Sequence, residues 1–243
     1  SVVAELAGEL PGRTKPPTPS EVKAPVQAIG VRRSRALPYE LAVVELETVG
    51  PLHLRFQNSG KAAAVFHVYD RLRLDAPPRR YTVEPGKSND GEWPKGPYDV
   101  CVYGPNGFFR SFAGSGSGTD VKRPLVQARI APMIGGPINF TLGFEIPSRG
   151  VPDRIHVTPG AYAEAMLPKV LTPSPAGKPP LIEHRWSLMR TGGWYDFVLS
   201  READAAWKRR YAGRAEIGTG ALTSDPAMGG AATGPNTTWR ATE

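Results

Sequence analysis

Short runs of alternating apolar and polar residues recur along most of the chain. In one of them, Leu52, Leu54 and Phe56 alternate with polar residues, so a β-strand would place all three on one face. A turn-forming sequence, Asn58-Ser59-Gly60, follows this run. Further strand-like runs lie at residues 41–48, 64–69, 80–83, 98–103, 108–112, 125–130, 138–144, 154–158, 181–189 and 194–199. Short strands at this spacing predict an all-β protein of antiparallel sandwiches.

The composition supports this prediction. The 243 residues include 27 glycines and 26 prolines, which is nearly twice the usual share of the two residues. Because glycine costs about 1 kcal/mol and proline about 3 kcal/mol inside a helix, long helices are disfavoured. A helical turn or two is expected only in the segment from Glu202 to Arg210.

A motif of the form G-x-Y-D, followed by R-x-[FY]-A-G, occurs twice in the chain. The first copy comprises Gly96–Asp99 and Arg110–Gly114, and the second comprises Gly193–Asp196 and Arg209–Gly213. The two copies are separated by about 100 residues, which is the size of one Ig-like sandwich domain. The repeat therefore predicts a duplicated unit, with two tandem Ig-like β-sandwiches and little helix.

The repeated motif has a structural and a functional interpretation. In the structural one, a Tyr at the strand end returns its hydroxyl to the backbone, and Asp99–Arg110 and Asp196–Arg209 pair across strands. Opposite charges on neighbouring strands contribute about 0.2–1 kcal/mol. The functional alternative, a ligand site in each unit, is less favoured. The predicted structural residues are Tyr98, Asp99, Arg110, Gly114, Tyr195, Asp196, Arg209 and Gly213.

Proline, glycine and serine mark the expected domain boundaries. Residues 1–37 read as a proline-rich basic linker, 38–117 as the first sandwich, 118–230 as the second and 231–243 as a flexible tail. The glycine–serine run from Gly114 to Gly118 is expected to be a plain connection rather than a phosphate-binding loop. A chain that opens on Ser1 without a signal peptide is expected to be a fragment or a processed product.

The formal net charge of +7 is carried mainly by the first and last thirds of the chain. Such a charge favours phosphate-bearing partners such as membrane headgroups, although a solvated basic face with no partner is the preferred interpretation. No recognition motif for nucleic acid accompanies the charge, so nucleic acid is not an expected partner. The single cysteine, Cys101, excludes an intrachain disulfide and a cysteine-rich zinc site.

Two clusters are candidates for contact with lipid or with a protein partner. They are Phe108, Phe109 and Arg110 after a turn, and Lys208, Arg209 and Arg210 in the second unit. The favoured alternative is that one phenylalanine packs inward and the pair anchors the core of a hairpin. Trp194 and Trp207 are likewise expected in the core.

The residues provide no recognisable catalytic set. The four histidines are scattered, without the spacing of a metal site, and no sequence feature places a nucleophile beside a base. The sequence therefore predicts no catalytic residue, no metal ligand and no cofactor.

Five segments, in the same order, carry a resemblance to a known family. They are Arg35–Leu41, Arg80–Gly86, Gly104–Arg110, Gly193–Asp196 and Ser224–Gly229. Together they resemble the C-terminal tandem repeat region of bacterial secreted phosphocholine-preferring phospholipase C, of the haemolytic and non-haemolytic types.

The resemblance implies two accessory β domains of a secreted bacterial enzyme that hydrolyses lipids of the phosphatidylcholine or sphingomyelin type. It also implies an upstream catalytic phosphoesterase domain as partner, with residues 1–37 as the linker that follows it. These β domains would stabilise the enzyme or assist its docking on phospholipid surfaces, without catalytic residues of their own. The alternative function is a β-sandwich module that binds a protein or a carbohydrate.

Overall fold

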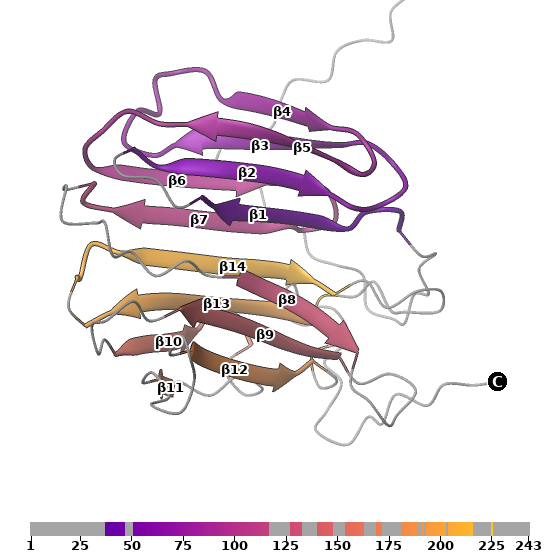
Figure 1. Ribbon diagram of the computed structural model, residues 1–243, viewed down its shortest axis with the longest axis vertical. Helices are drawn as coiled ribbons and strands as arrows, with labels where there is room; N and C mark the ends of the chain where they lie inside the picture. The colour runs from indigo at the N-terminus through magenta and orange to yellow at the C-terminus, as the bar shows by residue number, and fades with distance from the viewer. Residues whose placement is uncertain are drawn as a thin grey trace, which may run out of the picture.

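Fourteen strands, β1 to β14, follow one another in the part of the chain that the computed structural model describes (Figure 1). The described residues are 37–46, 51–116, 127–132, 140–147, 154–162, 169–171, 181–188, 191, 193–202, 204–215 and 225. No helix within these ranges has the length and apolar character needed to cross a membrane.

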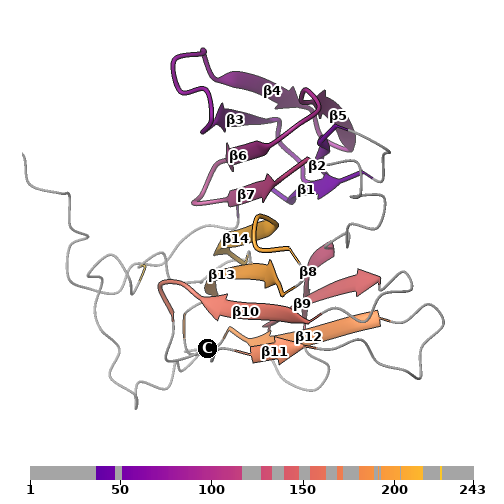
Figure 2. The same ribbon diagram turned by 90° about the vertical axis from the view of Figure 1, so that its left-hand side faces the viewer.

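The first seven strands form a sandwich of two antiparallel layers. They are β1 (Leu41–Glu45), β2 (His53–Asn58), β3 (Ala64–Asp70), β4 (Arg79–Val83), β5 (Lys87–Glu92), β6 (Tyr98–Tyr103) and β7 (Phe109–Gly114). One layer has the order β1-β2-β5, and the other has the order β4-β3-β6-β7. The two layers lie face to face in Figure 2.

The last seven strands repeat this arrangement. They are β8 (Gln127–Pro132), β9 (Phe140–Pro147), β10 (Ile155–Pro159), β11 (Lys169–Leu171), β12 (Leu181–Ser187), β13 (Trp194–Arg201) and β14 (Lys208–Arg214). Their layers have the orders β8-β9-β12 and β11-β10-β13-β14, so each strand corresponds to the strand seven places earlier. The predicted all-β fold of two tandem sandwiches from a duplicated unit is confirmed.

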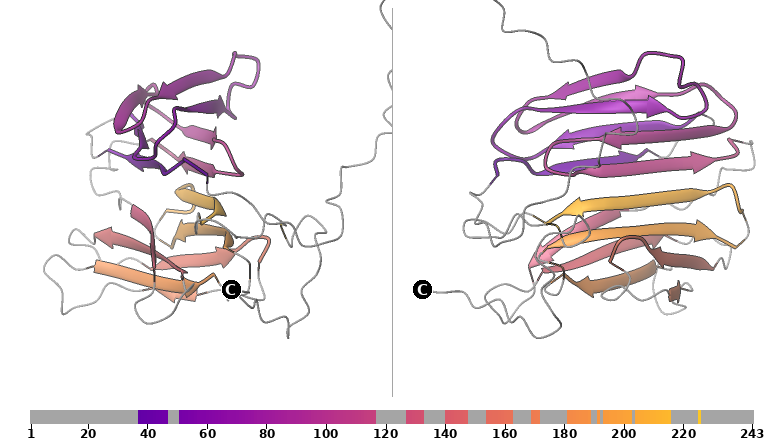
Figure 3. Two further views of the ribbon diagram at one scale, coloured as in Figure 1. Left: turned by 90° about the vertical axis from the view of Figure 1, so that its right-hand side faces the viewer. Right: turned by 180° about the vertical axis from the view of Figure 1, so that it is seen from behind.

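The two sandwiches share one sheet. Strand β7 of the first pairs antiparallel with β14 of the second, with Arg110 opposite Tyr211. This pairing joins the two four-stranded layers into an eight-stranded sheet, which Figure 3 shows from behind. We call the β7–β14 junction the seam. The three-stranded layers remain separate sheets on the other side.

Each sandwich has its own core, built from alternate residues of its strands. In β2 the alternation predicted from the sequence buries Leu54 and Phe56. In the second core, Phe197, Leu199 and Trp207 are buried. The turn between β6 and β7 contains Asn106 and Gly107, both at positive φ, a conformation that these two residue types adopt at low cost.

One predicted element is wrong, and some strands were not anticipated. The segment from Glu202 to Arg210, expected to form a helical turn, instead contains a tight turn closed by the Trp207 N–H to the Asp204 carbonyl (3.1 Å), and β14 begins at Lys208. Pairing with β7 and β13 on both sides overrides the local helical tendency. Strand β5, Lys-Ser-Asn-Asp-Gly-Glu, has no apolar alternation because it lies at the edge of its layer with only Gly91 buried.

Several predictions concern residues outside the described ranges. They include the linker before residue 37, the connection after residue 116 and the tail from residue 231. The predicted domain boundaries therefore remain predictions.

Candidate functional site

Two buried arginines lie at the seam and extend toward opposite sandwiches. Arg110 comes from β7 and Arg209 from β14, and their exposed fractions are 5% and 1%. A guanidinium group cannot lose its proton at ordinary pH, so each buried arginine needs hydrogen-bond acceptors close by. Those acceptors come largely from the other repeat.

Arg110 reaches from the first repeat to the second. Its Nη2 donates to the Tyr195 hydroxyl (2.9 Å), and its Nη1 donates to the carbonyl of Ala212 (2.9 Å). Its guanidinium lies 4.1 Å from the ring centre of Phe108 and 5.2 Å from that of Tyr211. These aromatic contacts stabilise the cation where water is excluded.

Arg209 makes the mirror set of contacts in the first repeat. Its Nη2 donates to the Tyr98 hydroxyl (2.9 Å), and its Nη1 donates to the carbonyl of Ala113 (2.6 Å). Its guanidinium lies 4.8 Å from the ring centre of Trp207 and 5.5 Å from that of Phe112. Each partner occupies the position in the motif that corresponds to a partner of Arg110, so the seam has approximate two-fold symmetry.

Arg209 also has a charged partner, a buried carboxylate. The Nε and Nη2 of Arg209 donate to Oε2 of Glu45, at 2.9 and 2.6 Å, and both side chains are almost fully buried. Burial opposes the charge on Arg209, but Glu45 and Tyr98 outweigh it, so the pKa of Arg209 lies above its usual value. The ion pair ties β14 to β1, which belongs to the opposite layer of the first sandwich.

The glycines that end the two motifs are explained by the tyrosines that precede them. Tyr98 lies directly opposite Gly114 in the β6–β7 ladder, and Tyr195 lies opposite Gly213 in the β13–β14 ladder. A Cβ atom on Gly114 would lie 2.4 Å from the Tyr98 hydroxyl oxygen, and one on Gly213 would lie 3.0 Å from that of Tyr195. Each tyrosine ring therefore crosses its glycine and presents its hydroxyl to the arginine of the other repeat.

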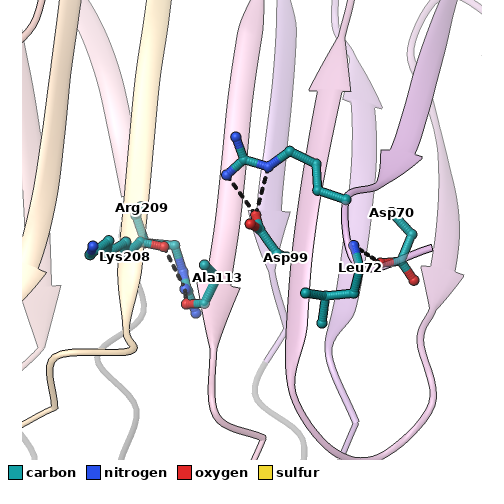
Figure 4. A network of polar contacts seen from close by, with 7 residues as sticks. Asp70, Leu72, Asp99, Ala113, Lys208 and Arg209 are labelled. Atoms are coloured by element: carbon teal, nitrogen blue, oxygen red, sulfur yellow. Dashed lines mark hydrogen bonds and ion pairs between the residues drawn. The ribbon is translucent and has the colours of Figure 1, made fainter. Parts of the chain in front are cut away.

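The predicted Asp99–Arg110 and Asp196–Arg209 pairs are wrong. Opposed residues of an antiparallel pair share a face; Asp99 is opposite Ala113, whereas Arg110 is opposite Val102, so Asp99 and Arg110 point to opposite faces. Asp99 accepts hydrogen bonds from Arg71 instead. Figure 4 shows the position of Asp99 and the Arg209 contact to Ala113.

The second aspartate follows the same rule. Asp196 accepts two hydrogen bonds from Arg210, at 2.8 and 2.7 Å, on the outer face of the shared sheet. The hydrogen bond to Asp196 raises the pKa of Arg210 by more than burial lowers it, so this pKa lies above its usual value. The motif aspartates therefore orient arginines on the outer face, while the motif arginines hold the seam.

The residues predicted to contact lipid or a partner divide between interior and surface. Phe108 belongs to the first core, as the favoured alternative expected, and Arg110 and Arg209 lie inside. Lys208 is exposed, and the Arg210 side chain is 45% exposed. Phe109 is half-buried on the outer face, 5.5 Å from the Arg210 guanidinium. The buried positions of Phe108, Arg110 and Arg209 leave them no surface for contact with lipid. Lipid contact by Phe109, Lys208 and Arg210 remains a prediction.

The two tryptophans and the cysteine also have definite places. Trp207 is buried in the second core, and Trp194 packs against that core while half-buried. Cys101 is buried, and its burial raises the pKa of the thiol. Among the residues that the structure describes, no three His, Cys, Asp or Glu side chains gather in a way that could hold a metal ion.

Comparison with known proteins places this architecture in a family. The model of the family described as "Bacterial phospholipase C, C-terminal domain" matches residues 33–115, which contain the first sandwich. The first sandwich therefore belongs to this family of phospholipase C C-terminal domains. The repeated strand order shows that the second sandwich is another copy of the same unit.

Named relatives of the phospholipase C family extend over nearly the whole chain. This chain is 38% identical over 226 residues to the "Non-hemolytic phospholipase C" of Pseudomonas aeruginosa, and the match covers 88% of this chain. It is 36% identical to that of Burkholderia pseudomallei and 33% identical to the "Hemolytic phospholipase C" of Pseudomonas aeruginosa. The chain spans only 30–31% of the length of these relatives.

Sequence reasoning missed one surface feature of this phospholipase C domain. The loop between β3 and β4 carries two exposed leucines, Leu72 and Leu74, among arginines. The alternation Arg71-Leu72-Arg73-Leu74 outside any expected strand is the signal that could have identified it. Apolar residues in a turn between strands are unusual because such segments normally face water.

Proposed function

We propose that this chain is the accessory β module of a bacterial phospholipase C and contributes no catalytic residue. The parent enzyme hydrolyses phosphocholine lipids of the phosphatidylcholine or sphingomyelin type, is secreted, and carries its catalytic phosphoesterase domain upstream. The observation that carries this proposal is the similarity to phospholipases C about three times as long as the matched region.

The structure supports a module that acts as one body. The eight-stranded sheet spans both repeats, and Arg110 and Arg209 each bind a tyrosine of the other repeat. These contacts join the two repeats into one unit, so that a surface on one repeat is oriented together with the other. We therefore assign two roles to the module, stabilisation of the enzyme and placement of it on phospholipid surfaces.

The aromatic residues of the outer face favour lipid over sugar as the bound partner. Tyr69, Tyr103 and Phe109 form a row across β3, β6 and β7, with ring planes at 89° and 62° to their neighbours. Rings tilted in this way form no flat platform of the kind on which a sugar ring stacks. An aromatic side chain beside Arg210 is instead suited to an interface that contains lipid phosphates.

Comparing the longer enzyme with a version that lacks the module tests the proposal. Docking predicts a lower rate on lipid vesicles with an unchanged rate on a soluble chromogenic phosphocholine ester, and stabilisation predicts a lower melting temperature. If the truncated enzyme matches the intact one in all three measurements, the accessory role is refuted. The isolated chain should not turn over the soluble ester with or without added divalent metal, and turnover would show that the chemistry resides here.

A further inference from the structure

The loop between β3 and β4 presents an apolar surface that the fold does not use. Residues 71–77 are all exposed, and Leu72 and Leu74 are 55% and 70% exposed. Leu74 is the most exposed large apolar side chain that the structure describes. Leucines in this setting cost free energy in water unless a partner covers them.

Hydrogen bonds fix the shape of this loop. The backbone N–H of Leu72 donates to Oδ1 of Asp70 (3.1 Å), and that of Arg73 donates to the Asp70 carbonyl (3.0 Å). Further along, the Ala76 N–H donates to the Arg73 carbonyl (3.1 Å). The leucines are thus held outward by a pre-formed loop, which reduces the entropy lost when a partner binds.

The charge around the leucines is mainly positive. Between residues 70 and 80 the chain has four arginines and two aspartates. Arg71 and Arg73 remain about half exposed, although they pair with Asp99 and Asp70. Arg79 and Arg80 follow at the start of β4 and are also exposed.

A small cavity lies at the base of the loop, between two of these arginines. Its volume is about 120 Å³, and its lining includes Asp70, Arg73, Arg79 and Trp93. The Arg79 guanidinium lies 4.9 Å from the ring centre of Trp93 and donates to the carbonyl of Glu92 (2.7 Å), which fixes its direction. The Arg73 guanidinium is held by Asp70 in the same lining. Both guanidinium groups are thus oriented beside apolar residues, an arrangement that suits a phosphate attached to lipid.

We propose that the β3–β4 loop is the element that inserts into an anionic phospholipid surface. The two leucines enter the boundary between headgroups and acyl chains, while the four arginines contact lipid phosphates. This inference rests on the proposed accessory function and specifies which part of the module meets the lipid.

The shape of the region favours a lipid surface over a protein partner. The loop projects from the corner of the first sandwich beside the edge strand β4, and the seam lies on the other side of that sandwich (Figure 2). A stable protein interface buries at least about 1,000 Å² with good complementarity. A projecting loop with two leucines offers little area for such an interface, whereas a fluid lipid layer adapts to it.

Co-sedimentation of the whole chain with vesicles tests the inference. The vesicles contain phosphatidylcholine mixed with phosphatidylglycerol, and the variant is L72S/L74S. We expect at least about a tenfold loss of binding, because the variant removes two side chains that would become buried. The matched control is V170S, which removes an exposed apolar side chain from β11 and should bind like the unmodified chain.

A second measurement reports insertion directly. An environment-sensitive fluorophore is attached at L74C in a C101S background, with V170C in the same background as control. Vesicles should shift the emission of the label at position 74 to shorter wavelength and leave that at position 170 unchanged. Raising the salt concentration should weaken vesicle binding, since the arginine contacts are screened.

Each other outcome has a defined meaning. Vesicle binding that L72S/L74S leaves intact overturns the loop assignment and preserves lipid docking. A chain that binds no vesicle overturns the loop assignment, and the stabilising role of the module survives. If L72S/L74S in the longer enzyme lowers the rate on the soluble ester as much as on vesicles, the loop packs on protein, which also overturns the inference.

Discussion

At the scale of single residues, the seam buries an ion pair between Arg209 and Glu45. Both side chains are almost fully buried, and the Arg209 guanidinium lies among the rings of Tyr98, Phe112 and Trp207. A buried pair contributes little net stability compared with a well-packed apolar pair, yet removal of one partner leaves a charge that cannot be hydrated.

Replacing Arg209 with methionine should destabilise the chain strongly. We expect R209M to lower the free energy of unfolding by about 3–5 kcal/mol, because Glu45 would remain buried without its cation. Urea denaturation measures this change. The neighbouring exposed substitution K208M should stay within about 0.5 kcal/mol of the parent.

A double variant distinguishes the stranded charge from lost packing. E45L/R209M removes both charges and should recover a large part of the stability lost in R209M. If the double variant is as unstable as R209M, lost packing rather than the unpaired carboxylate explains the cost.

The thiol of Cys101 should react slowly in the folded protein. Burial hides the sulfur and raises its pKa, so little thiolate forms near neutral pH. A disulfide-exchange reagent at mildly alkaline pH should label the unfolded chain rapidly and the native chain many times more slowly. Equal rates in the two states would show that β6 opens readily.

At the scale of elements, each motif makes a β-hairpin in which a tyrosine crosses a glycine. The hairpins are β6–β7 and β13–β14, and their tyrosines cannot move away freely because an arginine from the other repeat holds each hydroxyl. The repeated motif therefore reflects contacts that the seam needs, namely a tyrosine that crosses a glycine and binds the arginine of the other repeat. It also reflects the duplication of the unit.

Substitution of Gly114 tests this arrangement. We expect G114A to lower the free energy of unfolding by about 1–3 kcal/mol, because the new Cβ would lie 2.4 Å from the Tyr98 hydroxyl oxygen. Thermal denaturation followed by circular dichroism measures the change. The cost of G114A should shrink in a Y98L background, where the obstructing ring is absent, and purely additive effects would contradict the explanation.

At the scale of the whole molecule, the seam makes the two sandwiches dependent on each other. Strand β14 supplies the hydrogen-bonding partner of β7, and the exchanged arginines place charge from each repeat beside the aromatic residues of the other. Separation would expose two strand edges and two buried arginines, both of which are unfavourable.

The chain should therefore unfold in one cooperative step. Differential scanning calorimetry should show a single transition for the intact chain, with equal calorimetric and van't Hoff enthalpies. The variant R110M/R209M should separate the melting of the two sandwiches into two transitions. Two transitions in the unmodified chain would mean that the seam couples the repeats only weakly.

Much of the fold follows from patterns that are local in the sequence. Alternation such as that of Leu52, Leu54 and Phe56 identifies a strand because successive side chains of a strand face the core and the solvent in turn. The repeated G-x-Y-D motif identifies two units because a duplicated sequence retains its turns. Strand β5 and the start of β14 were missed because their pairing partners, rather than their own residues, hold them in the sheet.

The roles of the motif residues were decided only by the tertiary structure. Whether an aspartate and an arginine meet depends on strand register, and a shift of one residue moves a side chain to the opposite face. The observed register places Asp99 beside Arg71 on the outer face of the sheet. It places Arg110 and Arg209 on the inner face, where each contacts a tyrosine of the other repeat. The exposure of Leu72 and Leu74 likewise depends on the tertiary structure, because no other segment that the structure describes covers the loop between β3 and β4. The sequence by itself determined two sandwiches of short strands, because hydrophobic alternation and turns act between neighbouring residues. The seam was decided only by the tertiary structure, because it depends on contacts between residues about 100 positions apart.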